Sequence, residues 1–195
     1  MLGENKLKNL AQIGLKHSKA DQTEIMISTT SQALSRFANS QIHQNTEYVN
    51  ASVSVRAVIG RRIGVSSTNR LDVLSIKQAV DRAIEIARLQ KEDPFFKSLP
   101  EPQEVITALH GYKSSTASHS PKDKAVILQD IFKKSQSASL SASGAFETDV
   151  TEIAVANSLG VWAYHPMTQA RLSLTTTGDN STGYASQVNQ DVSEI

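Results

Sequence analysis

The stretch ASVSVRAVIGRRIGVSST, residues 51–68, carries the pattern on which the fold prediction depends. Small apolar residues alternate with polar ones before Gly60, which is typical of a strand with one buried face. The expected buried face carries Val53, Val55, Ala57 and Ile59, and the opposite face carries Ser52, Ser54, Arg56 and Val58. Glycine tolerates the positive φ that hairpin turns need, so residues 60–62 should reverse the chain. Residues 63–67 would then return as a second, antiparallel strand.

The flanking segments predict helices and further strands. Residues 4–16 place Leu7, Leu10 and Ile13 on one helical face. Residues 23–28 and 33–37 read as two short strands, and Asn39–Ser40 as a turn. Asp72 can cap a helix that runs to about residue 90. The apolar stripe of that helix consists of Ile76, Ala79, Val80, Ala83, Ile84 and Ala87.

The second half of the chain follows a similar order. Prolines at 94, 100 and 102 impose extended backbone, residues 105–109 form a short strand or turn, and residues 112–120 form a polar loop. Ser120 and Pro121 begin another helix, with a cap followed by proline at the first position. Its expected apolar face is Ala125, Leu128, Ile131 and Phe132. The expected strands cover residues 137–146, 151–156, 161–165, 169–178 and 184–187, with turns at 157–160 and 178–183.

These two halves repeat one unit. The triplet Ala38-Asn39-Ser40 recurs at 156–158, a shift of 118 in residue number, and the same shift moves Gly60 onto Gly178. It also lays the helix at 4–16 on the helix at 122–134, and a one-residue insertion brings Asp72 onto Asp191. We therefore predict an α+β fold: mixed, mainly antiparallel sheet with packed helices, in an internally duplicated helix-meander-helix unit.

The repeat also divides the chain. We expect a first α+β unit at 1–90, a proline-containing linker at 91–119 and a second, truncated unit at 120–195, together forming one N-terminal domain of a longer protein. The helix that starts at Asp72 has almost twenty residues, whereas the chain continues for only about one turn past Asp191. We expect the parent sequence to continue past Ile195 with an amphipathic helix.

Composition excludes several classes of function. The 195 residues contain no cysteine, so disulfides and cysteine-ligated metals are excluded, and a cytoplasmic location fits. No apolar run is long enough for a transmembrane helix, and no signal peptide opens the chain. The formal charge of +1 supplies no field for a polyanion. Arg61 and Arg62, with Arg56 and Arg70 nearby, are interpreted as a solvated hairpin end.

The residues offer no catalytic, cofactor-binding or metal site. His17, His43, His110, His119 and His165 lack the spacing of helical zinc motifs and read as surface or loop residues. Glu147, Asp149 and Glu152 approach a carboxylate cluster, but without a basic or nucleophilic neighbour in sequence they read as a solvated strand. Gly60 and Gly64 are explained by turn chemistry, and Asn180 is a glycosylation acceptor only in a secreted protein.

Four segments together resemble the amino-terminal domain of the TldD/PmbA family. They are ALSRFANSQIH at 33–43, VSVRAVIGRRIGVSSTN at 53–69, ARLQKEDPFFKSLPEP at 87–102 and EIAVANSLGVWAYH at 152–165. The resemblance implies zinc metallopeptidases or their non-catalytic partners, which process modified peptides, degrade antitoxins and are also called modulators of DNA gyrase. Catalytic members carry a His-Glu-x-x-x-His motif and a cysteine ligand. This sequence contains neither, so no zinc or catalytic residue is carried over to any of its positions.

The resemblance leads to a function hypothesis with two alternatives. The first reading is a non-zinc-binding domain that contributes dimer assembly and the cleft through which peptide substrates reach zinc held elsewhere. Zinc is expected only if the parent protein carries the downstream motif. The alternative is a non-catalytic PmbA-like partner subunit or assembly module, towards which the Glu92-Asp93-Pro94 linker leans. The expected partners are a peptide substrate and a TldD/PmbA-family subunit, in a homo- or heterodimer. Binding to a membrane is not expected. Nucleic acid ranks last because of the near-zero charge.

Overall fold

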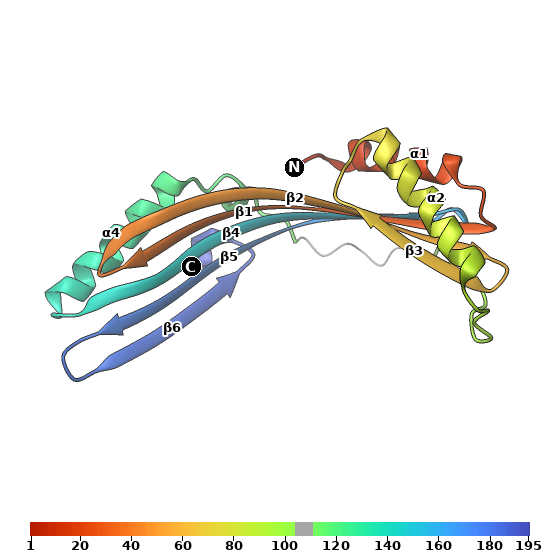
Figure 1. Ribbon diagram of the computed structural model, residues 1–195. Helices are drawn as coiled ribbons and strands as arrows, with labels where there is room; N and C mark the ends of the chain where they lie inside the picture. Colours follow the sequence, from red (N-terminus) through yellow and green to blue (C-terminus); the bar gives the residue numbers. More distant parts are fainter. Residues whose placement is uncertain (104–110) are drawn as a thin grey trace. The chain divides into compact units, whose positions relative to one another are not determined.

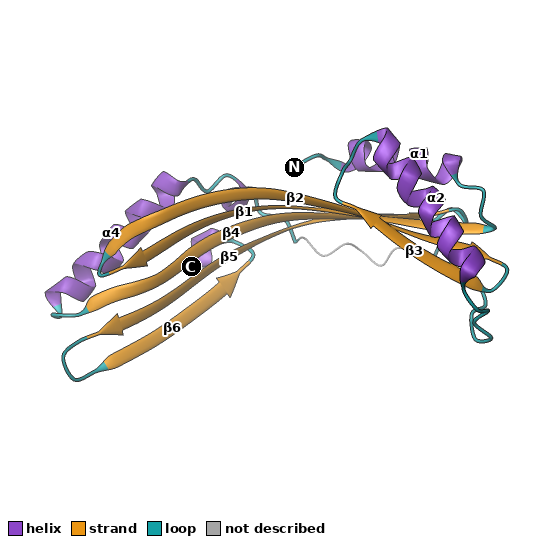
Figure 2. Ribbon diagram, viewed as in Figure 1, coloured by secondary structure: helices purple, strands orange, loops and turns teal. Residues whose placement is uncertain are grey.

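The computed structural model describes residues 1–103 and 111–195 (Figure 1). These residues form four α-helices, one short 3-10 helix and a six-stranded antiparallel sheet in the order β3-β2-β1-β4-β5-β6. Figure 2 distinguishes the helices from the strands. The predicted α+β class is confirmed. None of the described helices is long and apolar enough to cross a bilayer.

The elements follow one order twice. The first series is α1 (Glu4–His17), β1 (Gln22–Ala38), β2 (Gln41–Ile59), β3 (Arg62–Thr68) and α2 (Val73–Leu89). After the short helix α3 (Ser114–Ala117) comes the second series: α4 (Pro121–Ser137), β4 (Ser141–Asn157), β5 (Trp162–Thr177), β6 (Thr182–Asn189) and η1 (Val192–Glu194). A helix, three antiparallel strands and a helical segment thus recur, as the repeat in the sequence predicts.

The strands are longer than the sequence pattern indicates. The two short strands expected at 23–28 and 33–37 are both parts of β1. The strands expected at 137–146 and 151–156 merge into β4, and those expected at 161–165 and 169–178 merge into β5. The interrupting residues are mostly polar, with serine and threonine at 29–31, 148 and 168. They break the apolar alternation but are compatible with extended backbone, so the ladder continues through them.

Two further expectations are wrong. Residues 112–120 contain the single-turn helix α3 instead of a wholly polar loop. Residues 138–140 do not begin a strand, because they complete the carboxyl end of α4: Ser139 has a φ of 57° and Leu140 N donates to Ser135 O at 2.8 Å. The strand or turn expected at 105–109 lies outside the described residues.

Side-chain caps start both long helices that follow a turn. Asp72 accepts a hydrogen bond from Ser75 N at 2.9 Å at the start of α2. Ser120 and Asp123 form a reciprocal capping box at the start of α4, with Pro121 in the first turn. Both predicted starts are confirmed, and each cap satisfies backbone N–H groups that the helix itself leaves unpaired.

The described chain forms two compact units. The first contains Met1–Thr30, the described part of Asn50–Leu109, and Glu152–His165; the second contains Ser31–Val49, the described part of His110–Thr151, and Pro166–Ile195. Strands β1, β2, β4 and β5 therefore contribute residues to both. The division into 1–90, 91–119 and 120–195 follows the sequence repeat and stays a prediction.

The core of the first unit lies between strands and two helices. Figure 2 shows α1 and α2 beside each other on one face of the strands of this unit. The predicted buried positions of α2 are confirmed. On β2, Val53, Val55 and Ala57 are buried as expected, but Val58 on the opposite face is buried as well. The core cluster consists of Leu7, Ala11, Ile25, Ile27, Val53, Val55, Ala57, Ile76, Ala79, Val80, Ala83, Ile84, Ala154 and Ala156.

The second unit has its own core beneath α4. Phe37 of β1 and Phe132 of α4 meet with ring centroids 5.4 Å apart. The buried cluster is Phe37, Leu128, Ala142, Phe146, Ala170 and Val192. Aromatic pairs of this kind pack edge against face and contribute beyond the area that they bury.

Two glycines have distinct roles in the β2–β3 hairpin. Gly60 has a φ of 60° in the two-residue turn between the partners Ile59 and Arg62. Gly64 instead allows α2 to approach β3, since a Cβ at this position would lie 2.1 Å from the carbonyl oxygen of Ala83 and 2.3 Å from the amide nitrogen of Ala87. The helix backbone therefore sits directly on the strand.

We expect Gly64→Ala to lower the free energy of unfolding by about 2 kcal/mol or more, because backbone atoms cannot move aside as a flexible side chain can. Urea unfolding followed by circular dichroism measures the change. Gly183→Ala on β6 is the control, since its Cβ would meet only the Thr176 hydroxyl, at 3.2 Å. Equal stability of the two variants would contradict the close helix–strand contact.

Candidate functional site

A buried lysine lies at the centre of the most unusual polar cluster in the second unit. Lys124, in the first turn of α4, has no solvent-exposed surface. Its Nζ donates a hydrogen bond to the carbonyl of Ala33 on β1 and lies 5.8 Å from the centroid of the Phe146 ring. A fully buried lysine is rare unless it is paired. The expected apolar face of α4 did not include this residue, although Leu128 on the same face follows it by four positions.

The surroundings of Lys124 favour its neutral form more than water does. Burial lowers the pKa of Lys124 to about 8, against the opposing effect of the carboxylates of Asp149, Glu147 and Glu47. The ammonium is thus still the main form at neutral pH, but a sizeable neutral fraction exists within physiological range.

A small pocket opens beside this lysine. Its volume is about 130 Å³, and its walls come from β1, β2 and the start of α4. Ser35 donates a hydrogen bond to Asn45 Oδ1 at 2.6 Å within the wall. The lining residues are Ala33, Leu34, Ser35, Asn45, Thr46, Glu47, Pro121 and Lys124.

The carboxylates predicted as a solvated strand are partly buried. Gln32 donates to Glu147 at 3.5 Å, and Arg171 Nη1 lies 3.9 Å from the same carboxylate. Burial raises the pKa of Asp149, while a hydrogen bond from Gln32 and the charge of Lys124 oppose the rise. Asp149 Oδ1 is buried without a hydrogen-bond partner. The solvated interpretation is therefore wrong for Asp149, and sequence proximity could not reveal that the charge of Lys124 acts on it.

His119 lies near the same cluster. Its ring centroid is 5.7 Å from that of Phe146, and its buried Nε2 has no hydrogen-bond partner. Burial lowers the pKa of His119, Asp123 opposes this shift, and the positive charge of Lys124 adds to it. The prediction of a loop position is confirmed, but the side chain is partly buried.

Glu152 has a different role, in the first unit. It is 1% exposed and accepts hydrogen bonds from Leu2 N at 2.7 Å, Gly3 N at 2.8 Å, Thr29 Oγ1 at 3.0 Å and Tyr164 Oη at 2.9 Å. Burial would raise the pKa of Glu152, but these four donors outweigh it, and the pKa is lowered. The solvated-strand interpretation is wrong here too: the carboxylate fixes the amino-terminal segment onto β4.

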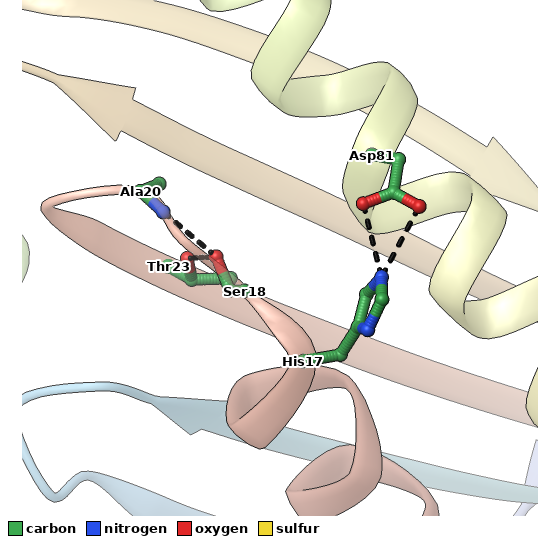
Figure 3. A network of polar contacts seen from close by, with 5 residues as sticks. All are labelled: His17, Ser18, Ala20, Thr23 and Asp81. Carbon is green, nitrogen blue, oxygen red and sulfur yellow. Dashed lines mark hydrogen bonds and ion pairs between the residues drawn. The ribbon is translucent and has the colours of Figure 1, made fainter.

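The remaining histidines do not form a site. His17 at the end of α1 pairs with Asp81 of α2, its Nε2 lying 3.0 and 3.1 Å from the two carboxylate oxygens (Figure 3). Beside it, Ser18 contacts the hydroxyl of Thr23 at 2.6 Å and accepts from Ala20 N at 3.2 Å. His43 is exposed on β2 and His165 is partly buried on β5.

His110 lies outside the described residues. Among the residues that are described, no three His, Asp or Glu side chains gather as a metal site would require.

The arginines near the hairpin are mostly paired with carboxylates. Arg56 bonds Glu24, Arg62 lies 3.6 Å from Glu92, and Arg70 bonds Asp72 at 2.9 Å. Asn180 is exposed in the turn before β6. These contacts agree with the interpretation of this region as a charged hairpin end.

Two family models match the chain in succession. Residues 23–87 match PmbA/TldA metallopeptidase domain 1, and residues 115–194 match the PmbA/TldA metallopeptidase central domain. The chain belongs to the TldD/PmbA family. Lys124, Glu147, Asp149 and Glu152 all lie within the part that matches the central domain of this family.

Solved structures share the TldD/PmbA fold over almost the whole chain. TldE from Thermococcus kodakarensis aligns with a TM-score of 0.81 at 19% identity, over 95% of this chain and 43% of that chain. A structure described as a modulator of DNA gyrase from Bacteroides thetaiotaomicron aligns with a TM-score of 0.82 at 16% identity, over 100% and 47%. A structure from Thermotoga maritima with a similar description aligns with a TM-score of 0.77 at 14% identity, over 98% of this chain and 44% of that chain.

The chain therefore spans less than half the length of each of these solved structures. No curated protein matches it by sequence.

We expect Glu152→Gln to lower the free energy of unfolding by about 3 kcal/mol, because an amide cannot accept hydrogen bonds on both sides and loses the charge. Denaturant unfolding at pH 7 measures the loss, with the exposed Glu85→Gln as control. Because the folded pKa of Glu152 is lowered, its contribution is present above the ordinary glutamate pKa and declines as pH falls through the folded pKa. A penalty that stays constant from pH 7 to pH 3 would contradict the charged role.

We expect the difference in the free energy of unfolding between the wild type and Lys124→Met to change with pH in the alkaline range. Between the folded pKa of about 8 and the unfolded value of 10.5, the unfolded chain binds the proton and the folded chain releases it. The wild type should therefore gain stability relative to the variant as pH rises from 8 to 10.5. Lys133→Met on the same helix, whose side chain is 66% exposed, should show no such trend. A difference in the free energy of unfolding that stays constant from pH 8 to 10.5 would contradict the lowered pKa of Lys124.

Proposed function

We propose that this chain is a non-zinc-binding part of a TldD/PmbA-type metallopeptidase system, contributing dimer assembly and the cleft through which peptides reach the catalytic zinc. The observation that carries the proposal is the successive match to the first and central domains of the metallopeptidase family. Hydrolysis of small or unfolded peptides is then the activity of the complete system. A cytoplasmic location is part of the proposal, in keeping with a chain that lacks cysteine.

The edges of the sheet support a role in assembly and peptide contact. β3 and β6 stand at the two ends of the sheet order, so each has one unpaired edge among the described strands. Tyr184 and Val188 of β6 are 70% and 50% exposed. Exposed edge strands accept a further strand through main-chain hydrogen bonds, from a partner subunit or from an extended peptide.

A second candidate is a non-catalytic PmbA-like partner subunit or assembly module, whose parent protein hydrolyses nothing. The Glu92-Asp93-Pro94 segment favours it. In this structure Asp93 N donates to Arg61 O at 2.9 Å, which fixes the segment to the β2–β3 turn. Binding of nucleic acid ranks below both candidates because the formal charge is only +1.

The test combines zinc analysis, peptide hydrolysis and assembly. The purified chain should contain no stoichiometric zinc by elemental analysis and should not cleave a fluorogenic unfolded peptide. It should form a dimer, with itself or with an added TldD/PmbA-family subunit, in size-exclusion chromatography with light scattering. One zinc per chain, or hydrolysis by the chain alone, would contradict the non-catalytic role. A chain that stays monomeric and does not bind the added subunit would contradict the assembly role.

A further inference from the structure

The edge of β2 within the second unit is unpaired over a long stretch. β3 pairs with β2 only from Val53 to Ile59. Within the described part of the chain, no strand lies against the outer edge of residues 41–52, and the side chains at 43–49 are all exposed. The outward backbone N–H and C=O groups of such an edge are available to another strand.

An apolar groove lies between this edge and α4. Its volume is about 460 Å³. Ile42 and Phe132 form part of its wall while packing onto the core, and Val126 is 58% exposed beside them. Lys122 and Gln129 add polar groups to the lining. A groove with apolar walls and a few polar groups, next to an open strand edge, suits an apolar side chain of an added strand.

The pocket at Lys124 follows along the same edge. Asn45 and Glu47 of β2 lie in its wall. The ammonium of Lys124 has three N–H donors, and among the described residues it gives one hydrogen bond, to the carbonyl of Ala33. The exposed carboxylate of Glu47 would face a basic side chain at the entrance.

The groove beside Val126 and the pocket beside Lys124 are two hollows along one edge. Their spacing fits the spacing of side chains in an extended peptide. Ile42 packs onto the core under α4, and Glu47 lines the pocket at Lys124, so both hollows lie on the α4 side of β2. Five positions of a regular strand would span roughly 17 Å and end on opposite faces, so β2 departs from strict alternation between these residues and the span is shorter. Side chains on one side of an added strand recur every second residue, so positions i and i+4 lie about 14 Å apart. One such pair can reach both hollows, the first in the groove and the second at the pocket.

Resting on the proposed peptide-handling function, we propose that residues 41–49 of β2 bind an extended peptide as an added strand. The peptide places an apolar side chain against Val126 and a basic side chain, four residues away, at Glu47. The unpaired main chain supplies affinity independent of sequence, and the two hollows supply a side-chain preference.

The test uses the full 195-residue chain and a fluorescein-labelled peptide, Ser-Thr-Leu-Thr-Ser-Thr-Lys-Thr, followed by fluorescence anisotropy. Val126→Glu should weaken binding at least tenfold. Val73→Glu is the matched control, because Val73 is 45% exposed on a helix, α2, and not on an edge strand of the sheet, and it should change binding less than twofold. A peptide with alternate backbone nitrogens methylated, in either of the two registers, should lose binding in at least one register, since strand addition requires its N–H groups.

A charge exchange tests the second hollow and does not depend on the groove. Glu47→Lys should weaken binding of the lysine peptide, and replacing that lysine by glutamate should restore binding to this variant. Circular dichroism melting confirms that each variant is folded, which is expected because Val126 and Glu47 are exposed.

Several outcomes would overturn the proposal. Unchanged binding by Val126→Glu, stronger weakening by Val73→Glu, or no binding of the probe would each do so. A dimer without peptide that Val126→Glu dissociates would instead assign this edge to a second copy of the chain. The proposed family function is judged separately, by zinc content and by association with a family subunit, so either idea can fail alone.

Discussion

Long antiparallel strands need cover on the face that carries their apolar residues, and this requirement governs the rest of the structure. β1, β2 and β4 have 17, 19 and 17 residues, and within each unit the helices cover the strand face that carries the apolar residues. In the first unit the fit is close enough that α2 rests on the backbone of β3 at Gly64. In the second unit α4 covers the strands with fewer large apolar side chains, and a lysine occupies one of its buried positions.

Two buried charges are tolerated for different reasons. Glu152 stays ionised because four hydrogen-bond donors surround it, so its burial is compensated locally. Lys124 has one hydrogen bond to a carbonyl and only the more distant charges of Glu47, Glu147 and Asp149, so its pKa shifts instead. The first arrangement is typical of a fixed structural anchor. The second leaves donor capacity unused in the interior, next to a pocket whose lining includes the exposed Glu47.

Much of the fold follows from local sequence signals, but the site does not. Capped helices were predictable because Asp72, Ser120 and Pro121 act on their own neighbours. Strand lengths were underestimated where polar residues, such as those at 29–32 and 147–149, break the apolar alternation. Glu152 could not be paired from sequence, because its partners Leu2 and Gly3 lie some 150 positions away. Lys124 had one usable signal: it precedes Leu128 by four residues and therefore falls on the apolar face of α4.

The unpaired edge of β2 is open to pairing with another strand. The formal charge of +1 provides little repulsion between copies of the chain. Such an edge invites uncontrolled pairing unless its residues resist it. Residues 43–49 combine polar side chains, among them His43 and Glu47, with the exposed side chains of Tyr48 and Val49. The groove and the pocket both include residues of α4. An incoming strand is therefore stabilised only when its side chains match these hollows. Pairing at this edge is selective because the main chain of β2 offers hydrogen bonds to any added strand, whereas the groove and the pocket beside α4 favour strands with matching side chains.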